Sequence, residues 1–533
     1  MEFDFVIIGA GSAGCALANR LSNNAKHSVA IIEAGGQDIN PWIHIPVGYF
    51  KTMGNPKVDW LYKTQKDPNL NHRQIPWPRG RVLGGSSSIN GLLYVRGQSQ
   101  DFNHWRQLGN TGWAWEDVLP YFKRAETWHS NGDIDPARGT DGPLSVSPPP
   151  LKRTIVDMWV NAAVSAGYQR NEDYNGAQQE GVGYFQTTLR NGKRCSSADA
   201  YLKPANKRAN LKIITQAQAE RILIKDDRAF GVIVNIKGQS QEIHARREII
   251  LSAGSIGSPQ ILMLSGVGAA RELKKHGINV IKNLPGVGKN LQDHLQARPV
   301  FKTNLSTINV EMNNIFKQGL IALQYAISRT GPMTMAASLG TGFLKTDPIL
   351  ATPDIQFHIQ PWSAIKPPKE FHKFSAFTAS VLQLRPESTG HLELVSADWR
   401  EHPAIHPNYS ATKLDQDTIV KGINIARKIA QFEPLKSHII EEFSPGSSVA
   451  EDDYDAILKW VRKTSVTIYH PTGTCKMGQD KMAVVDEKLR VIGIDGLRVA
   501  DCSIMPVISS GNTNAPAIMI GEKASDMILA DVA

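Results

Sequence analysis

The chain has 533 residues, of which 41% are hydrophobic and 20% are charged, and its mean hydropathy is −0.26. This composition is that of an ordinary globular protein and excludes an intrinsically disordered one. The length exceeds the roughly 250 to 300 residues at which a single core stops growing, so we expect two domains. The formal net charge is +9, but no five consecutive residues are Lys or Arg. The sequence therefore lacks the basic stripe of a nucleic-acid-binding protein.

Four cysteines lie far apart in the sequence, at Cys15, Cys195, Cys475 and Cys502. They form no C-x-x-C pair and no metal-ligand spacing, so we expect free thiols in a reducing compartment. The chain begins almost directly with an apolar strand, which leaves no room for a signal peptide, and it contains no run of about 18 apolar residues. We expect a cytoplasmic protein, with peripheral association at the inner membrane as an open alternative.

The first predicted strand, Phe5–Ile8, is a largely β-branched apolar run typical of a buried parallel strand. It leads into the sequence Gly9-Ala10-Gly11-Ser12-Ala13-Gly14 and then into a segment with helical spacing. In such a turn Gly9 allows the tight bend, Gly11 lets the backbone approach a pyrophosphate, and Gly14 lets the helix and strand pack closely. The motif predicts a dinucleotide site, with a plain turn as the alternative.

A second predicted strand, Val29–Ile32, ends at Glu33, 19 residues after the last glycine of the motif. An acid at this spacing accepts hydrogen bonds from a ribose hydroxyl. No arginine follows that would accommodate a 2′-phosphate, so FAD or NAD is favoured over NADP. The residues of this unit alone leave the choice between FAD and NAD open.

Glycines and serines concentrate in the segment from Arg79 to Gly91, whose backbone N–H groups are suited to an anion nest. From Arg79 to Gly97 the chain resembles the first sequence pattern of the glucose-methanol-choline (GMC) oxidoreductases. The stretch from Gly254 to Gly268 resembles the second pattern, and Gly286–His294 follows as in that family. The similarity runs from the first strand to the last helix, is weakest over about 150–195 and 300–460, and looks closest to bacterial FAD-dependent alcohol and choline-dehydrogenase-like enzymes.

The resemblance implies FAD as the cofactor. Since relatives with covalent flavin have a histidine at the position of Ile89, it also implies that FAD is bound non-covalently. It implies an α/β protein with a discontinuous Rossmann-type FAD-binding domain over 1–150, 194–298 and 466–533. A substrate-binding domain, built on an antiparallel sheet with helices, would occupy 151–193 and 299–465. The residues expected at the cofactor are Gly9, Gly11, Ser12, Gly14, Glu33, Ala34, Arg81, Gly84, Ser86, Asn90, Val95, Ala219, Asp501, Asn514 and Pro516.

Gln296 bears on the substrate. In choline-oxidising members of the family a glutamate occupies this position and faces the quaternary ammonium group. Glutamine supplies no charge to balance a buried cation, so choline is disfavoured. We expect an uncharged aliphatic, aromatic or polyether primary alcohol.

An apolar, helix-like patch lies over residues 315–327. A buried helix or a lid over a substrate channel is favoured for it, with contact to a bilayer as the alternative. Further on, 381–384 and 391–394 are predicted to pair as strands around a turn at 387–390. His402 and His406 have the wrong context for a metal site, because prolines flank them and no third ligand is evident, so no metal is expected.

His470 lies in a His-Pro-x-Gly-Thr context in which the family has its catalytic histidine. A neutral imidazole suits the removal of a hydroxyl proton near neutral pH. Asn514 follows 44 residues later, where the resemblance places the partner His or Asn. An asparagine amide can orient the hydroxyl or stabilise the developing alkoxide, although a simple helix cap is the alternative.

The predicted function is FAD-dependent oxidation of a primary alcohol to its aldehyde, with His470 as the base, Asn514 as its partner and flavin N5 as the hydride acceptor. A dehydrogenase that uses a quinone-like acceptor is favoured over an oxidase that uses O2. A choline dehydrogenase, or a lyase or photodecarboxylase built on the same scaffold, stays open.

Overall fold

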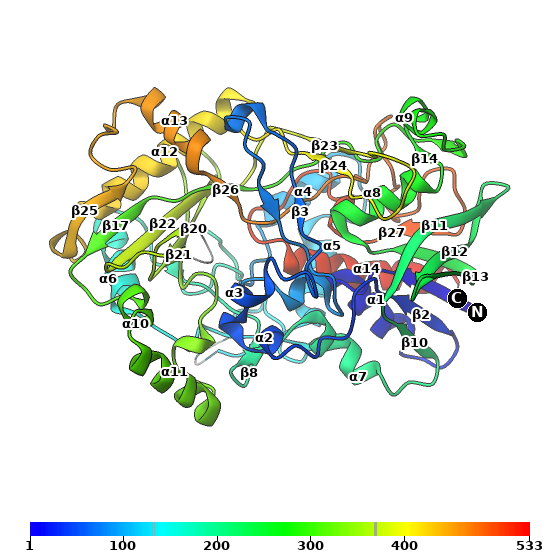
Figure 1. Cartoon of the computed structure of the whole chain (residues 1–533), viewed down its shortest axis with the longest axis horizontal. Coiled ribbons are helices and arrows are strands. Elements are labelled where there is room, and N and C mark those ends of the chain that lie inside the picture. Colours follow the sequence, from blue (N-terminus) through cyan, green and yellow to red (C-terminus); the bar gives the residue numbers. More distant parts are fainter. Residues whose placement is uncertain (131, 133, 367–369, 533) are drawn as a thin grey trace.

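A computed structural model of the chain describes residues 1–130, 132, 134–366 and 370–532. Two large sheets lie toward opposite ends of the molecule (Figure 1). The first has the order β10-β2-β1-β13-β12-β11, with β27 paired to β13. Its strands are β1 (Glu2–Ile8), β2 (Val29–Ile32), β10 (Leu211–Ile214), β11 (Ala217–Lys225), β12 (Arg228–Ile236), β13 (Gln239–Leu251) and β27 (Leu497–Val499).

Strands β10, β2, β1, β13 and β27 run parallel, while β11 and β12 add an antiparallel pair. The residues from Phe5 to Ile8 and all of β2 are buried, as expected for strands covered on both faces. Helix α1 (Ser12–Leu21) packs against the C-terminal helix α14 (Asn514–Asp531). Their axes approach so closely that a Cβ at Gly521 would lie 2.5 Å from the Ala13 carbonyl oxygen. The two ends of the chain are therefore joined at the glycine loop.

The second sheet has the order β25-β17-β22-β19-β18-β7, and its pairings are antiparallel. Two short strands, β16 and β26, pair with each other, and β16 also pairs with β22. Helices α6 (Thr154–Ser165), α12 (Lys413–Ala430) and α13 (Tyr454–Thr464) contribute to the core beside this sheet. The strands are β7 (Gly181–Tyr184), β16 (Leu295–Ala297), β17 (Val300–Thr303), β18 (Gly340–Leu344), β19 (Ile355–Gln360), β22 (Ala376–Gln383), β25 (Ile439–Ser444) and β26 (Val466–Thr467).

Two details differ from the sequence-based expectations. Strands β16 and β26 fall inside segments that we expected in the FAD-binding domain, yet both pair within the second sheet. The predicted pairing of 381–384 with 391–394 is wrong. Strand β22 pairs with β16, β17 and β19, whereas β23 (His391–Glu393) pairs with β24 (Ala404–His406). In both cases the partner strand lies far away in the sequence. The local alternation of apolar and polar residues carries no information about which strand that partner is.

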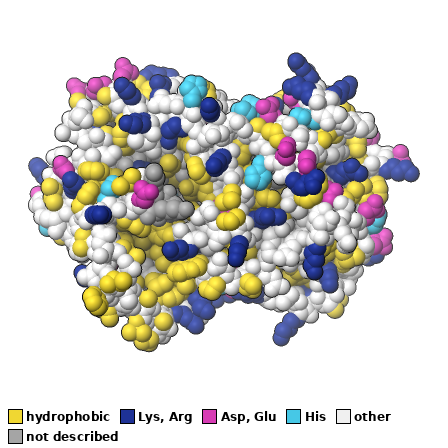
Figure 2. Space-filling view, in the orientation of Figure 1, with side chains coloured by type: hydrophobic (Ala, Val, Ile, Leu, Met, Phe, Trp, Pro, Cys, Tyr) yellow, Lys and Arg dark blue, Asp and Glu magenta, His cyan; other side chains and the backbone are white. Residues whose placement is uncertain are grey.

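The apolar patch predicted over 315–327 forms helix α11 (Ile315–Ser328). The helix is neither buried nor covered by other elements. Only Tyr325 is buried, while Ile315, Phe316, Leu320 and Ile327 are 66–82% exposed. The helix projects from the edge of the molecule (Figure 1), and hydrophobic side chains gather at the corresponding corner of the surface (Figure 2). None of the described helices is long and apolar enough to cross a bilayer.

Candidate active site

A cavity extends from the glycine loop of the first sheet to the second sheet. Gly9, Gly11 and Glu33 line one end, and His358 and Gln360 of β19 line the other. We call these the cofactor end and the substrate end.

Close backbone packing shapes the cofactor end. Gly9 has a positive φ of 103°, and a Cβ at Gly14 would lie 2.0 Å from the Gly9 carbonyl oxygen. No side chain fits there, so the N-terminus of α1 is held directly behind the loop. Its free N–H groups and partial positive charge suit a pyrophosphate. The loop over 79–91 packs directly against the glycine loop. The approach is so close that a Cβ at Gly85 would lie 2.7 Å from the Cα of Gly11.

Glu33 lies in the cavity wall beside Ala34 and Ala219. Its carboxylate accepts hydrogen bonds from the N–H groups of Ala10, at 3.0 Å, and Gly35, at 2.8 Å. Burial raises the pKa of Glu33 to about 7. The carboxylate is thus fixed at the edge of the cavity by one N–H group of the glycine loop and one of the turn after β2.

Most residues expected at the cofactor line the cavity, and they are Gly9, Gly11, Ser12, Glu33, Ala34, Ser86, Asn90, Ala219, Asp501 and Asn514. Within the described chain, Gly14, Arg81, Gly84, Val95 and Pro516 do not line it. Gly14 is covered by the loop, and the Arg81 guanidinium carbon lies 4.9 Å from the centre of the Trp60 ring. Asp501 is held by the Gly254 N–H at 2.9 Å and the Ser258 hydroxyl at 2.6 Å.

His470 follows strand β26 and is positioned by its own backbone. The preceding Tyr469 has a positive φ of 70°, and Arg79 donates a hydrogen bond to its carbonyl. The His470 N–H donates to Asp293 Oδ1 at 2.7 Å, while Asp293 Oδ2 accepts from Thr467 at 2.5 Å and from Tyr409. The segment that carries His470 is therefore held by the buried carboxylate of Asp293.

The hydrogen-bond network also assigns the tautomer of His470. His294 Nε2 lies 2.8 Å from the Leu384 carbonyl, which can only accept, so this nitrogen carries the proton. In the neutral ring Nδ1 of His294 is then an acceptor. It lies 3.0 Å from His470 Nδ1, which must donate. His470 Nε2 is then the unprotonated nitrogen of the ring, whose lone pair accepts a hydrogen bond.

Asn512 contacts that free nitrogen, since its Nδ2 lies 3.0 Å from His470 Nε2. Asn514, which the family resemblance gives as the partner of His470, lines the same cavity. Its Oδ1 accepts from Ser12 Oγ at 2.7 Å, and it is the first residue of α14 rather than its cap, which is Thr513. The turn before α14 is what separates the two asparagines, so that one faces His470 and the other faces the glycine loop.

Burial keeps the site histidines neutral. It lowers the pKa of His470 well below 6.5, and nearby His294 and His358 lower it further. Burial also lowers the pKa of His294 to about 4 and that of His358 to about 3. At neutral pH these imidazoles are uncharged, and His470 is in the form that accepts a proton.

Sequence reasoning did not identify Asn512, His294, Arg298 or His358 as site residues. Arg298 had the clearest signal, since it stands two residues after Gln296 and an extended chain turns alternate side chains to the same face. Both line the substrate end, and Arg298 Nη1 donates to Gln296 Oε1 at 3.3 Å.

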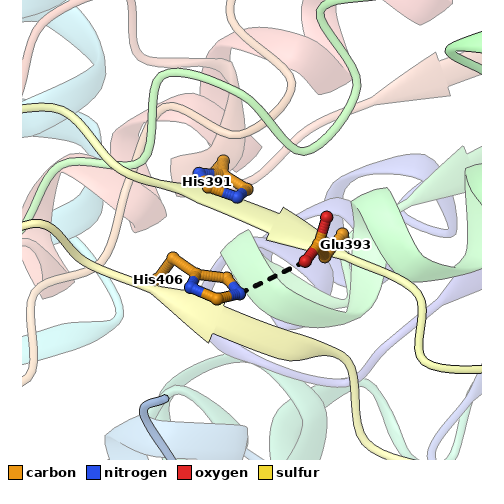
Figure 3. Close-up of side chains that lie close together, drawn as sticks. All are labelled: His391, Glu393 and His406. Atoms are coloured by element: carbon orange, nitrogen blue, oxygen red, sulfur yellow. Dashed lines mark ion pairs between the residues drawn. The ribbon is translucent and has the colours of Figure 1, made fainter. Parts of the chain in front are cut away.

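A separate polar cluster lies outside this cavity. His391 and Glu393 of β23 and His406 of β24 lie on one face of their two-stranded sheet (Figure 3). His406 Nε2 is 3.3 Å from Glu393 Oε1, and the two imidazoles stack with ring centres 4.6 Å apart. His406 therefore has two potential metal ligands beside it, His391 and Glu393, which the sequence did not indicate, and His402 is not part of this cluster.

The chain is similar to known proteins over almost its whole length. The GMC oxidoreductase profiles match residues 3–296 and 386–521. The oxygen-dependent choline dehydrogenases of Rhizobium johnstonii and Rhizobium meliloti are 44% and 43% identical to it, over 99% of this chain and 96% of theirs.

Two solved structures show the same fold. Pyridoxine 4-oxidase from Mesorbium loti has a TM-score of 0.89 at 28% identity and covers 98% of both chains. A variant of formate oxidase from Aspergillus oryzae, described through the modification of its FAD, has a TM-score of 0.92 at 29% identity and covers 99% of this chain and 98% of its own.

The cofactor end fits FAD. The glycine loop and the N-terminus of α1 suit its pyrophosphate, and Glu33 suits a ribose. Asn512 Oδ1 is buried between this end and His470 without a partner in the described chain, as a group that meets a polar ligand would be. The chain belongs to the GMC oxidoreductase family and is an FAD-dependent oxidoreductase that acts on CH–OH groups.

Proposed function

We propose that the protein oxidises a primary alcohol to its aldehyde and that His470 Nε2 is the base. The observation that carries this proposal is the tautomer of His470, whose unprotonated nitrogen faces the cavity beside Asn512. A hydroxyl that enters between them donates to Nε2 and accepts from the Asn512 amide. As the alkoxide develops, Nε2 takes the proton and the amide stabilises the negative oxygen.

Oxidation also removes a hydride from the carbinol carbon. FAD, when bound, would supply the acceptor for this hydride at its N5, and a quinone-like acceptor or O2 would take up the two electrons. The chain contributes the position of the base and keeps its imidazole uncharged. Asp293 holds the His470 backbone, and His294 holds the ring in its reactive tautomer.

Choline is not our preferred substrate, although the names of the most similar relatives refer to it. Gln296 and Arg298 stand at the substrate end. Neither balances the positive charge of a quaternary ammonium group, and Arg298 repels it. We therefore place the substrate among alcohols without a positive charge.

FAD is proposed to be dissociable. Ile89 lines the cavity and is 2% exposed, and its side chain has no atom that can bond covalently to a flavin ring. Acid precipitation should leave the yellow colour in the supernatant. Colour that stays with the precipitated protein would contradict this part of the proposal.

The function is tested by anaerobic mixing of the purified holoenzyme with primary alcohols. Loss of flavin absorbance together with one aldehyde per flavin is expected. A flavin that keeps its absorbance with every alcohol, or that changes only under illumination, would favour the lyase or photodecarboxylase alternatives. Turnover with O2 compared with a dye acceptor then distinguishes an oxidase from a dehydrogenase.

We further propose that helix α11 binds the surface of an anionic bilayer. Phe316, Leu320, Leu323 and Ile327 form one exposed stripe at helical spacing and are 56–82% exposed. Exposed Lys317 lies on the same helix, and the chain carries a net charge of +9, which favours anionic headgroups.

Sedimentation with vesicles tests this surface. The holoenzyme should sediment with phosphatidylglycerol vesicles, and a double variant with Phe316→Asp and Leu320→Asp should stay in the supernatant with unchanged flavin absorbance. Absence of the wild-type protein from the vesicle pellet would refute the proposal. A dimer that the same two substitutions dissociate would assign the stripe to a second copy of the chain instead.

A further inference from the structure

Four buried side-chain atoms at the substrate end have no hydrogen-bond partner within the described part of the chain. They are Tyr49 Oη, Arg298 Nη2, His358 Nε2 and Trp362 Nε1, and all four residues line the cavity. We call them the donor cluster. Buried polar groups are nearly always paired, so several orphans around one cavity point to a ligand that pairs them.

Arg298 provides the charge of the donor cluster. Burial lowers its pKa to about 10, so that it remains a cation at neutral pH. Nη1 donates to Gln296 Oε1 at 3.3 Å, and the guanidinium carbon lies 5.6 Å from the centre of the Trp362 ring. No ion pair of Arg298 exists among the described residues. A buried cation without a counter-ion is costly unless a ligand supplies the negative charge.

His358 is also a donor, because its neighbours fix its tautomer. Ser380 donates to Gln360 Oε1 at 3.1 Å, and Gln360 Nε2 donates to Ser338 Oγ at 3.2 Å. The Ser338 hydroxyl proton is then directed to His358 Nδ1, 3.3 Å away. We assign the ring proton to His358 Nε2, the tautomer in which the Ser338 hydroxyl donates to Nδ1. Together with the indole N–H of Trp362 and the hydroxyl of Tyr49, it offers hydrogen bonds that no described residue accepts.

No carboxylate of a described residue lines the substrate end. The acidic side chains among the described lining residues are Glu33 and Asp501, and both are held by backbone N–H groups at the cofactor end. The donor cluster lines the same cavity as the base, His470. A ligand that spans the substrate end can therefore meet Arg298 and His470 together.

We propose that the substrate is a primary alcohol that also carries an oxyanion, which Arg298 and the donor cluster bind while the carbinol meets His470 and Asn512. This inference rests on the proposed function and names its substrate class. A carboxylate is the favoured oxyanion, because a guanidinium matches its two oxygens in one plane. Tyr49, Phe50 and Trp362 form an aromatic wall that suits a flat ring between the two groups, with the rings of Phe50 and Trp362 centred 5.6 Å apart.

A matched pair of alcohols tests the proposal. Para-hydroxymethylbenzoate and para-methylbenzyl alcohol differ at the ring position opposite the carbinol, one carrying a carboxylate and the other a methyl group. With the holoenzyme, kcat/KM should be about 100-fold higher for the acid. Arg298→Gln should remove this preference by lowering kcat/KM for the acid about 100-fold more than kcat/KM for the neutral alcohol. The control Arg106→Gln, at a side chain that is 54% exposed, should change neither value.

Binding of an unreactive anion gives a second readout that does not depend on turnover. Calorimetric titration of the holoenzyme with benzoate should show one site, and Arg298→Gln should abolish it while the flavin spectrum and melting temperature are kept. Para-hydroxymethylphenylphosphonate, tested beside the carboxylate, shows which oxyanion the site prefers.

Equal kcat/KM for both alcohols, or an Arg298→Gln variant that loses the acid and the neutral alcohol equally, would overturn the proposal. So would the absence of benzoate binding. Failure of the proposed function looks different, since neither alcohol would then bleach the flavin, and benzoate binding alone would decide whether the anion site exists.

Discussion

The two ends of the cavity are built in different ways. At the cofactor end, short sequence motifs bring backbone segments into direct contact. Gly14 and Gly85, for example, allow backbone contacts that a Cβ would prevent. At the substrate end, side chains far apart in the sequence converge, from Tyr49 through Arg298 to Trp362. The first kind of site is readable as a local motif. The second exists only once the strands have paired.

His470 lies between the two ends and depends on both. Asp293 and His294, next to β16 of the second sheet, hold its backbone and its ring. Asn512, next to α14 at the glycine loop, reaches its other nitrogen. Substitutions at these positions therefore separate what each end contributes to the reaction.

Loss of the base should have the largest effect. His470→Ala should lower kcat/KM for a primary alcohol by about a thousandfold, because general-base catalysis contributes roughly 10² to 10⁴. The FAD content should not change, since the glycine loop and Glu33 are untouched. Steady-state kinetics on FAD-matched samples measures this, and a variant within tenfold of the wild type would remove His470 from the role of base.

Substitutions of Asn512 and Asn514 should affect different properties of the enzyme. Asn512→Ala should lower kcat about 100-fold with FAD retained, as expected when a donor to a developing alkoxide is removed. Asn514→Ala breaks the hydrogen bond to Ser12 and should instead weaken FAD binding with a smaller change in kcat. The comparison of kcat and FAD affinity for the two variants checks the assignment. The reverse pattern would restore Asn514 as the partner of His470.

His294 should have an intermediate effect as a positioning residue. His294→Phe removes the acceptor that holds the proton on His470 Nδ1, and kcat should fall about 10- to 100-fold, a part of the whole general-base contribution. His294→Gln can still accept at this position and should recover part of the loss. Equal activity of both variants would show that the ring of His294 does not control the tautomer.

The pH profile should show the smallest effect. His470 acts in its unprotonated form, and burial lowers its pKa well below 6.5. Activity is lost only as the pH falls through this lowered pKa, so kcat/KM should stay level from pH 8 down to 6.5 and decline below that. A profile of kcat/KM against pH tests the shift. A decline that is already half complete at pH 6.5 would mean that the site does not lower this pKa.

The sequence predicted the part of the molecule that depends on local rules. Strand β1, the glycine loop, Glu33 and His470 all stand in short patterns, and the structure brings all of them to one cavity wall. Asn514 came from the family resemblance, which gives a position in the motif but not the contact that the side chain makes, here with Ser12 Oγ.

Residues of the substrate end follow no comparable pattern. Arg298 and His358 become neighbours through β16, β22 and β19, and sequence alternation could not show which strands pair. The same limitation explains the wrong partner assigned to β23. The convergence of Arg298 with Tyr49, His358 and Trp362 is therefore visible only in the structure.

The pH dependence of flavin reduction in His470→Ala tests the central claim most directly. Rapid anaerobic mixing with a primary alcohol should show a wild-type rate constant that is level above pH 6.5. The variant should be slow at neutral pH and should accelerate as the pH rises, because solvent hydroxide must then remove the proton. A variant that reduces its flavin at the wild-type rate, or with the wild-type pH dependence, would show that another group is the base.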